Sequence, residues 1–467
     1  MKMWSGRFRQ GLDPEFEKWQ RSFDYDKRLL PFELAASRAH ARALEHSGVL
    51  SAEDLAQILE GLNKIEKLVK APEYFDDPEA EDVHHFVEKK LAALIGQTGY
   101  KLHAGRSRNE QIATDLRLFV RAAIDDLQGL LADFIEAMVS RAEAAGTAAM
   151  PGFTHLQPAE PVLVAHWLLA YVEMFLRDSE RLASCRKRVN ECPLGSGAIA
   201  GATLAIDRRA IAAELGFDDI TANSMDATSD RDFAIEFTQA LLLLSLHLSR
   251  WAEEMTLFST AAYDFVVLPE AYSTGSSAMP QKKNPDLLEL VRGKAARMAG
   301  FATALETAVK GLPLAYNKDL QETQEPLFGA ADTVTSMLPL VTGWMQAVEF
   351  NFDKMDTAAR SDFMNAWAAA AYLVERGVPS RQAHEAVGKA VKLCLELKCD
   401  LRELSLKDLK VIHPAFDSDL AARLELGEVL AIHDVPGGTA PQRVKQAIQN
   451  ARERVAALRP QAQAIAG

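Results

Sequence analysis

Aromatic and cysteine residues are scarce in this chain of 467 residues, and basic charge is not in excess. Aromatic side chains make up 7% of the sequence while Ala and Leu are abundant, which favours helix over sheet. The formal net charge of −13 argues against non-specific nucleic-acid binding, because such binding needs a basic surface. It does not argue against a small anionic substrate, since a single pocket can be locally basic.

The few cysteines do not form a recognisable metal or disulfide framework. Cys185 and Cys192 make one pair in the sequence, and Cys394 and Cys399 make another. Neither pair has the spacing of zinc ligands, and the stretch 1–7 has no apolar signal segment. We therefore expect a reduced, cytoplasmic protein.

No apolar run is long enough to cross a membrane. The longest run, Ala240–Leu248, is interrupted by Ser245 and His247. A transmembrane helix needs about 20 apolar residues, so we interpret this run as part of a buried helix. We expect no membrane partner.

Motifs for cofactors and metals are also missing. The stretch Gly195–Gly201 has one residue too many for a dinucleotide-binding fingerprint and no strand before it. The chain has no Walker loop and no Gly-x-Ser-x-Gly elbow. His84 and His85 are adjacent, so they point in different directions on a helix, and no third ligand is evident. We predict neither a cofactor nor a metal.

What the sequence does contain is long helical periodicity. Ser107 and Glu110 form a Ser-x-x-Glu capping box, and apolar residues follow at steps of three and four up to Ala145. At ~1.5 Å per residue this helix would be about 55 Å long. A stripe of this length needs equally long partners, which predicts a bundle. The candidate partners are Pro161–Val189, Arg231–Phe265, Pro285–Val309 and Glu322–Val348.

The pattern as a whole predicts an all-α protein with three helical domains. We expect a domain of mixed short helices and loops at 1–106, a central bundle of five long helices at 107–356, and a small helical domain at 357–467. The predicted helix at Arg231–Phe265 is apolar on nearly all sides, as a helix buried within an assembly would be. We therefore expect the bundles of several chains to pack together.

Two loop strings near the predicted helix ends carry polar groups suited to chemistry. The string Arg106–Asn109 lies at a helix start, where free amides and two arginines could bind carboxylates. A solvated cap with a surface charge pair fits the spacing equally well. The string Gly152–Pro161 contains His155, whose ordinary pKa near neutrality suits an acid or a base. A loop histidine without a role is the alternative there.

A third string, Gly275–Asp286, reads Gly-Ser-Ser-Ala-Met-Pro-Gln-Lys-Lys-Asn-Pro-Asp and lies between two helical patterns. Pro280 and Pro285 discourage helix around it. Reactive groups on a loop between rigid elements can close over a small substrate, whereas the alternative is a solvated turn. Glu289, on the next predicted helix, could orient a histidine.

The third string resembles the signature loop of the fumarase/aspartase superfamily, Gly-Ser-Ser-x-Met-Pro-x-Lys-x-Asn-Pro. Its ending resembles that of the argininosuccinate lyase family, and so do the strings His103–Asn109 and Thr154–Pro161. The resemblance runs from Trp4–Phe8 to Gln382–Gly388 and covers essentially the whole chain. Further similar strings are Cys192–Ala198, Ser229–Phe233 and Leu314–Gln321.

The resemblance implies the reversible anti β-elimination of argininosuccinate to L-arginine and fumarate, in a homotetramer whose sites draw on three chains. It implies Ser276 as the base and His155 as an acid or orienting group, and the two roles can also be exchanged. Lys282 and Asn284 would bind and polarise the succinyl carboxylate, and Glu289 is a further catalytic candidate. The implied substrate-binding residues are Ser22, Arg106, Arg108, Asn109, Thr154, Gln157, Tyr316 and Gln321.

Two positions depart from the family pattern and keep two alternatives open. Thr323 and Gln324 stand where members often have Asp-Lys, so a lysine contact to substrate is missing or replaced. Ala278 stands where the family commonly has Leu, whereas adenylosuccinate lyases can have Ala. An adenylosuccinate lyase-type enzyme is therefore one alternative, which the strings Gln281–Asp286 and Thr154–Pro158 disfavour. The other is a silent structural protein like the lens δ-crystallins, which the complete set of candidate catalytic residues disfavours.

Overall fold

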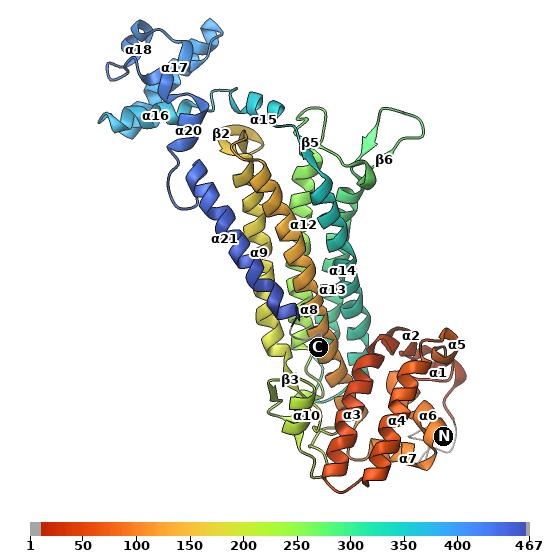
Figure 1. The fold of residues 1–467 in the computed structure, drawn as a ribbon. Helices are drawn as coiled ribbons and strands as arrows, with labels where there is room; N and C mark the ends of the chain where they lie inside the picture. Colours follow the sequence, from red (N-terminus) through yellow and green to blue (C-terminus); the bar gives the residue numbers. More distant parts are fainter. Residues whose placement is uncertain (1–10, 464–467) are drawn as a thin grey trace. The chain divides into compact units, whose positions relative to one another are not determined.

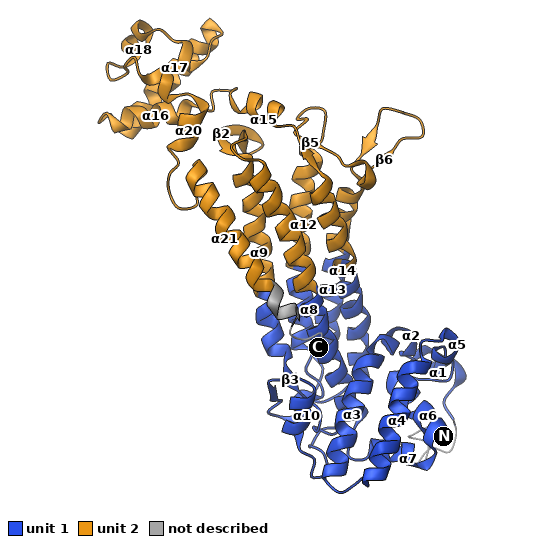
Figure 2. Cartoon of the chain, viewed as in Figure 1, with its two compact units in different colours: residues 1–126, 181–242, 297–333 blue, residues 127–180, 243–296, 334–467 orange. Residues whose placement is uncertain are grey.

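The computed structural model describes residues 11–463, so the Trp4–Phe8 string lies outside the described residues. The described chain is predominantly helical (Figure 1). It forms two compact units, each assembled from three stretches of sequence (Figure 2). Unit 1 comprises the described residues up to Asp126, Arg181–Leu242 and Arg297–Thr333, and unit 2 comprises Leu127–Glu180, Leu243–Ala296 and the described residues from Val334 onward.

Five long helices form between residues 107 and 350, as the sequence predicted. The longest of them, α8, has 37 residues, and the other four have 24 to 27. Each of the five contributes one part to unit 1 and the other to unit 2. Their bounds are Arg108–Ala144 for α8, Val164–Val189 for α9, Asp232–Phe258 for α12, Asp286–Val309 for α13 and Gln324–Ala347 for α14.

Aromatic rings packed edge to face fill the bundle interior within unit 2. The ring centroid of Phe134 on α8 lies 5.0 Å from that of Phe175 on α9 and 5.3 Å from that of Trp251 on α12. Trp251 in turn lies 5.2 Å from Trp344 on α14, in an edge-to-face arrangement. All four side chains are fully buried, so edge-to-face aromatic packing joins four of the long helices in this unit.

Two predicted helix boundaries were wrong. The second long helix begins at Val164 rather than Pro161, because β2 (Gln157–Leu163) pairs antiparallel with β1 (Ala149–Thr154). The third ends at Phe258 rather than Phe265, since the following residues turn and enter β5. The remaining short strands are β3 (Glu191–Cys192), β4 (Asp219–Ile220), β5 (Val266–Val267), β6 (Thr274–Gly275), β7 (Lys283–Asn284) and β8 (Glu349–Phe350).

Short helices precede the bundle, and their starts follow local capping chemistry. Helix α4 begins after Ser51, whose hydroxyl accepts a hydrogen bond from the Asp54 amide at 3.1 Å. The Asp54 carboxylate accepts from the Ser51 amide in return, which completes a capping box. These helices are α1 (Pro14–Trp19), α2 (Phe23–Asp26), α3 (Leu30–His46), α4 (Ala52–Leu68), α5 (Pro72–Phe75), α6 (Val83–Ile95) and α7 (Gln97–Tyr100).

The helices from 366 to 431 share a hydrophobic core of their own. Tyr372, Val387, Cys394 and Phe416 are buried in it. The predicted domain boundaries at 106 and 356 stay a prediction. The elements after the bundle are α15 (Phe352–Ala359), α16 (Ala366–Glu375), α17 (Ser380–Leu397), α18 (Leu406–Ile412), α19 (Leu420–Arg423), α20 (Leu426–Ala431) and α21 (Pro441–Gln463).

Helix α21 packs back on the part of the bundle that belongs to unit 2. A guanidinium nitrogen of Arg452 lies 2.6 Å from a carboxylate oxygen of Glu136 on α8. Arg454 donates to both carboxylate oxygens of Glu173 on α9 at 2.9 Å. None of the helices in the described chain combines the length and apolar character that crossing a membrane requires.

Candidate active site

The start of α8 has the capped form that the sequence predicted. The Glu110 carboxylate accepts a hydrogen bond from the Ser107 amide at 2.9 Å, and the Ser107 hydroxyl accepts from the Asn109 amide at 3.3 Å. The helix begins at Arg108, so the Arg106–Asn109 string spans the end of the loop and the first turn. Its two arginines therefore leave the backbone on either side of a helix start.

The two arginines have different surroundings. The Arg106 side chain is 4% exposed, and its guanidinium donates to the Ser37 hydroxyl at 2.9 Å and lies 3.8 Å from the Glu33 carboxylate. The Arg108 side chain is 22% exposed and lies 2.9 Å from an oxygen of Asp82. Arg106 is thus bonded within the protein, whereas Arg108 reaches a more open position.

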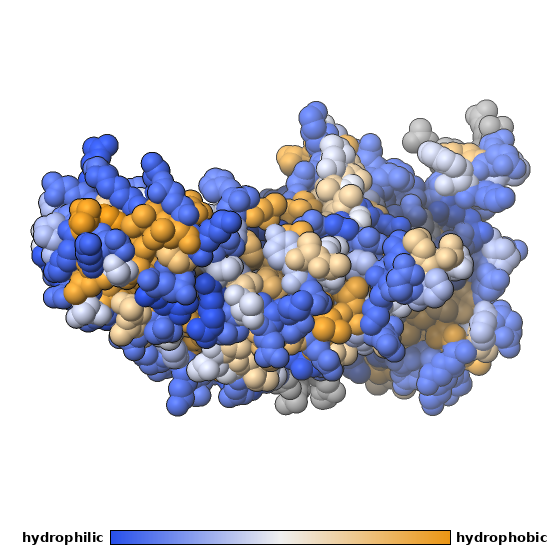
Figure 3. Space-filling view, turned by 90° about the horizontal axis from the view of Figure 1, so that it is seen from above, coloured by the Kyte–Doolittle hydropathy of each residue, from blue (hydrophilic) through white to orange (hydrophobic). Residues whose placement is uncertain are grey.

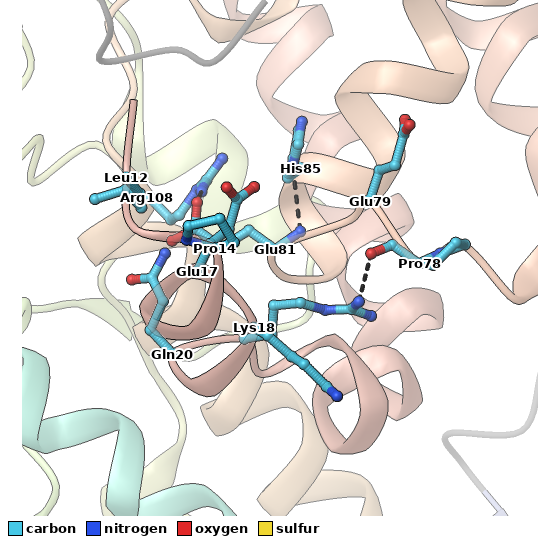
Figure 4. A pocket seen from close by; sticks show the side chains of 11 residues that line it. Leu12, Pro14, Glu17, Lys18, Gln20, Pro78, Glu79, Glu81, His85 and Arg108 are labelled. Atoms are coloured by element: carbon cyan, nitrogen blue, oxygen red, sulfur yellow. Dashed lines mark hydrogen bonds and ion pairs between the residues drawn. The ribbon is translucent and has the colours of Figure 1, made fainter. Parts of the chain in front are cut away.

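A cavity of about 450 Å³ lies beside Arg108 (Figure 4). Arg108 and Lys18 contribute positive charge to its lining, while Glu17 and Glu81 contribute negative charge. His85 accepts a hydrogen bond from the Glu81 backbone amide at 3.2 Å, which fixes one ring nitrogen at the edge of the cavity (Figure 4). A cavity lined by both signs can receive a ligand that carries carboxylates together with cationic groups.

Tyr316 and Gln321 belong to the same unit as Arg108. Tyr316 interacts electrostatically with Arg231, Asp82 and Arg108, and burial raises the pKa of its phenol. The Gln321 side chain donates to the Gln20 carbonyl at 3.0 Å. The Tyr316 phenol and the Arg108 guanidinium therefore interact through their charges. Gln321 lies against the turn that follows α1.

The sequence interpretation missed two carboxylates, Asp26 and Asp82. Ser22 bonds to the first, and the second acts on it through its charge. The Ser22 hydroxyl donates to Asp26 at 2.6 Å, and Asp26 also accepts from the Val83 amide at 3.0 Å. Burial, together with the charge of Asp82, raises the pKa of Asp26 to about 7. Burial alone would raise the pKa of Asp82 as well, but Arg108 and His84 hold it below its ordinary value. Asp82 could have been noticed in the sequence, because it lies close to the His84–His85 pair, which was considered only as a metal site.

Two buried carboxylates, Glu33 and Asp115, lie beside His84, and the sequence alone gave no sign of either as a neighbour. His84 Nδ1 lies 3.5 Å from a Glu33 oxygen and 3.8 Å from an Asp115 oxygen, and all three residues are buried. Burial raises the pKa of Asp115 well above its ordinary value, and the Glu33 charge adds to this effect. Gln111 donates to both Glu33 oxygens at 3.2 Å, and Arg106 supplies positive charge nearby. Protein donors thus already occupy Glu33, and the expectation of a metal-free protein stays a prediction.

His155 lies at the tip of a β-hairpin rather than in an irregular loop. Thr154 pairs with Gln157 at the end of β1 and β2, so His155 and Leu156 form the two-residue turn. Their φ angles are 56° and 58°, in the left-handed region that glycine and asparagine normally occupy in such turns. His155, Thr154 and Gln157 are all exposed in this unit. Strained backbone at an exposed polar tip is a feature of functional sites.

The Ser276 loop is a short hairpin whose polar groups bond to the backbone and to neighbouring side chains. Strands β6 and β7 pair Thr274 with Asn284, and the Asn284 amide also donates to the Thr274 hydroxyl at 3.3 Å. The Ser276 hydroxyl oxygen accepts from the amides of Ala278 at 3.3 Å and Met279 at 3.1 Å. Two donors aimed at one hydroxyl oxygen favour its ionised form.

The two lysines of this loop are placed differently. The Lys283 ammonium donates to the Leu268 carbonyl at 3.2 Å, and this hydrogen bond fixes the position of the side chain. Lys282 is exposed, and its charge contributes to lowering the pKa of Asp286. Glu289 was expected to orient a histidine, and its ion-pair partner in the described chain is Arg292 at 3.9 Å. Its role stays a prediction.

Comparison with known proteins identifies the family. A lyase family model matches residues 6–300, and a model of the argininosuccinate lyase C-terminal region matches residues 363–431. The argininosuccinate lyase of Koribacter versatilis is 58% identical over 98% of both chains, and that of Acidobacterium capsulatum is 55% identical over 98% of this chain and 96% of its own. The chain belongs to the argininosuccinate lyase family. Membership makes it a carbon–nitrogen lyase with argininosuccinate lyase activity, and it confirms the resemblance found in the sequence.

Solved structures of lyases share the fold. An EDDS lyase in complex with formate matches with a TM-score of 0.83 and 26% identity, covering 97% of this chain and 92% of its own. A class II fumarase from Schistosoma mansoni matches with a TM-score of 0.73 at 15% identity, covering 85% and 89% respectively. The prediction of an all-α, multi-domain fold is therefore confirmed.

Proposed function

We propose that this argininosuccinate lyase family member cleaves argininosuccinate reversibly to L-arginine and fumarate through the residues that the sequence singled out. The observation that carries the proposal is the group of Arg108, Asp82 and Glu81 beside the charged cavity. Argininosuccinate has carboxylates at both ends together with an ammonium and a guanidinium, so it needs anion and cation partners close to each other. Arg108 can bind a carboxylate, and the two acids can bind the cationic groups.

We propose Ser276 as the base that removes the proton next to a succinyl carboxylate. This step creates a second negative charge on that carboxylate, which Lys282, Asn284 and loop amides would stabilise. An ordinary serine is too weak a base, but the hydroxyl of Ser276 already accepts two backbone N–H groups. These donors, together with lysine charge and exclusion of water from the closed loop, would favour the alkoxide.

The departing guanidino nitrogen needs a proton, and we propose that His155 supplies or orients it. An exposed histidine on a two-residue turn can reach a substrate without rearrangement of the surrounding helices. Thr154 and Gln157, the pair that closes this turn, would contact substrate from either side. In the exchanged assignment His155 is the base, which the first prediction of the Discussion separates.

We further propose a cytoplasmic homotetramer in which neighbouring chains complete each site. Large apolar side chains on three long helices face solvent in one chain: Leu246 on α12 is 46% exposed, Leu290 on α13 is 61% exposed and Leu340 on α14 is 48% exposed. Apolar patches also interrupt the hydrophilic surface in the space-filling view (Figure 3). Such surfaces are normally covered by a partner. Light scattering that detects a fully active monomer would contradict this assembly.

A turnover assay with two substrates tests the function. The purified protein is incubated with argininosuccinate or with adenylosuccinate, and fumarate is followed by its ultraviolet absorbance. Fumarate from argininosuccinate alone is the expected result. Fumarate from adenylosuccinate would favour the adenylosuccinate lyase-type alternative, and fumarate from neither would favour a silent structural homologue.

A further inference from the structure

A tight loop, Pro193–Gly201, packs against the start of α8 within unit 1. The Gly195 amide donates to the Glu110 carboxylate at 2.5 Å, and the Gly197 amide also hydrogen-bonds to it. Glu110 is fully buried, and burial raises the pKa of its carboxyl although these amides oppose the shift. The same carboxylate accepts from the Ser107 amide in the capping box. One buried side chain therefore joins the loop to the helix start that carries Arg108 and Asn109.

Arg208 holds the loop from its other side. Its guanidinium donates to the Leu194 carbonyl at 3.1 Å, to the Ser196 hydroxyl at 3.3 Å and to the Thr221 hydroxyl at 2.9 Å. The loop also closes tightly on itself, because a Cβ atom on Gly197 would lie 2.6 Å from the Gly201 carbonyl oxygen. Its inner half thus has little freedom to move.

The outer half of the loop is exposed and reaches Asn109. The Asn109 side-chain amide donates to the Ala198 carbonyl at 3.5 Å, a long hydrogen bond. This contact distinguishes the two ends of the amide group, since only the nitrogen can donate to a carbonyl. The Asn109 side-chain oxygen is then directed elsewhere and can accept a hydrogen bond from a cationic group of a ligand.

We propose that Glu110 is a positioning residue that orients Asn109 for substrate through the Pro193–Gly201 loop. Its buried carboxylate holds the loop at a fixed distance from the helix start. The Ala198 carbonyl of that loop in turn accepts from the Asn109 side-chain amide and so orients it. This inference rests on the proposed function, in which Asn109 binds substrate. It gives Glu110 a role beyond the helix cap that the sequence assigned to it.

Steady-state kinetics of Glu110→Gln test the proposal. The amide has similar size but only one accepting oxygen, so it cannot serve the Ser107 and Gly195 amides as the carboxylate does. We expect KM for argininosuccinate to rise roughly ten-fold while kcat changes by less than about three-fold, because binding geometry is lost and the reacting groups remain. A residue with a merely structural role would lower the thermal midpoint without this division between KM and kcat.

A matched pair of glycine variants keeps the test decisive if Glu110→Gln folds poorly. Gly197 and Gly201 both have positive φ, at 62° and 97°, so alanine strains the backbone at either position. Only at Gly197 would the new methyl group meet the chain, since a Cβ at Gly201 has no neighbour within 4 Å. Gly197→Ala should therefore raise KM, and Gly201→Ala should leave it near the wild-type value.

Three results would overturn the inference. An active wild-type enzyme together with unchanged KM in Glu110→Gln and Gly197→Ala would show that Asn109 does not depend on the loop. Equal increases of KM in both glycine variants would show general loop strain instead of displacement toward Asn109. A fall of kcat alone would place the effect on the chemical step. A wild-type protein that releases no fumarate would instead refute the proposed function itself, which separates the two failures.

Discussion

The charged helix start in unit 1 and the two polar hairpins in unit 2 differ in the partners of their candidate functional side chains. Around Arg108, side chains bond to other side chains: Asp82 pairs with the arginine, and Ser22 bonds to Asp26. On the hairpins, Ser276 accepts from backbone amides of its own loop, and His155 projects from a turn. The residues proposed to bind substrate are thus already paired with other side chains, whereas of the two residues proposed for proton transfer His155 is exposed and Ser276 is partly exposed.

This difference predicts whether a variant in each region changes affinity, stability or the chemical step. A variant in the buried network alters charge partners and hydrogen bonds, so it changes affinity or stability. A variant at an exposed hairpin removes few contacts, so it changes the chemical step while the fold remains intact. Four predictions follow this division, and each could break it.

The largest effect is expected at Ser276. Ser276→Ala removes one oxygen from a loop whose neighbours are exposed, so the thermal midpoint should barely change. If Ser276 is the base, kcat should fall by roughly 10²–10⁴, the usual range for a general base. Steady-state assays measure this fall, and substrate binding should survive because Arg108, Lys282 and Asn284 remain.

Ser277→Ala is the control for that experiment. It makes the same chemical change one residue away and should cost much less activity. If both variants lose activity equally, the loop acts as a lid and the assignment of the base is wrong. Near-normal turnover in Ser276→Ala would make His155 the leading candidate for the base.

Arg108→Lys should have the next largest effect. A lysine keeps the charge but cannot reproduce the planar, two-pronged hydrogen bonding of a guanidinium. We expect kcat/KM for argininosuccinate to fall roughly 10–100-fold, mainly through KM, as is typical when a binding contact is lost. Wild-type kinetics in this variant would show that Arg108 only pairs with Asp82 at the surface.

Arg106→Lys sharpens the comparison between the two arginines. Because the Arg106 guanidinium is bonded to Ser37 and lies beside Glu33, its loss should reduce stability rather than affinity. Hydrogen bonds of charged groups contribute about 1.5–3 kcal/mol, so denaturant titration should detect a fall in the free energy of unfolding of roughly this size. A rise in KM with unchanged stability would return Arg106 to the substrate-binding set predicted from the sequence.

The last prediction concerns Asp26 and the dependence of stability on pH. Its pKa in the folded protein is raised to about 7, so the folded state holds a proton there that the unfolded chain releases at lower pH. The contribution to stability is full below about pH 4 and is lost as pH rises to about 7. Asp26→Asn cannot titrate, so its unfolding free energy should lack a component on the order of 4 kcal/mol over this range. Parallel pH profiles of the two proteins would contradict the shift.

Local signals explain which parts of the molecule the sequence predicted. The cap at Ser107 and the long periodic stripes depend on residues three or four positions apart, so the start of α8 and the five long helices could be found. The hairpin at Ala149–Leu163 was missed because the sequence interpretation placed a loop at Gly152–Pro161 and a helix from Pro161 onward, although edge strands tolerate proline.

Long-range partners could not be found in the same way. Gln111 donates to Glu33 across 78 positions of sequence, and no spacing rule links such residues. The different directions of Arg106 and Arg108 depend on these partners, so the sequence treated the two arginines as equivalent. Glu110 shows the limit most clearly: its capping role was readable, while its bond to Gly195 spans 85 positions.

The left-handed turn at His155 and Leu156 restricts how that histidine can be probed by mutagenesis. Asparagine adopts this backbone readily, so His155→Asn removes the imidazole without bending the hairpin. A β-branched replacement such as His155→Val would force the turn to change shape and would confuse lost chemistry with a moved strand. The left-handed backbone conformation of His155 and Leu156 thus determines which variants give interpretable kinetics.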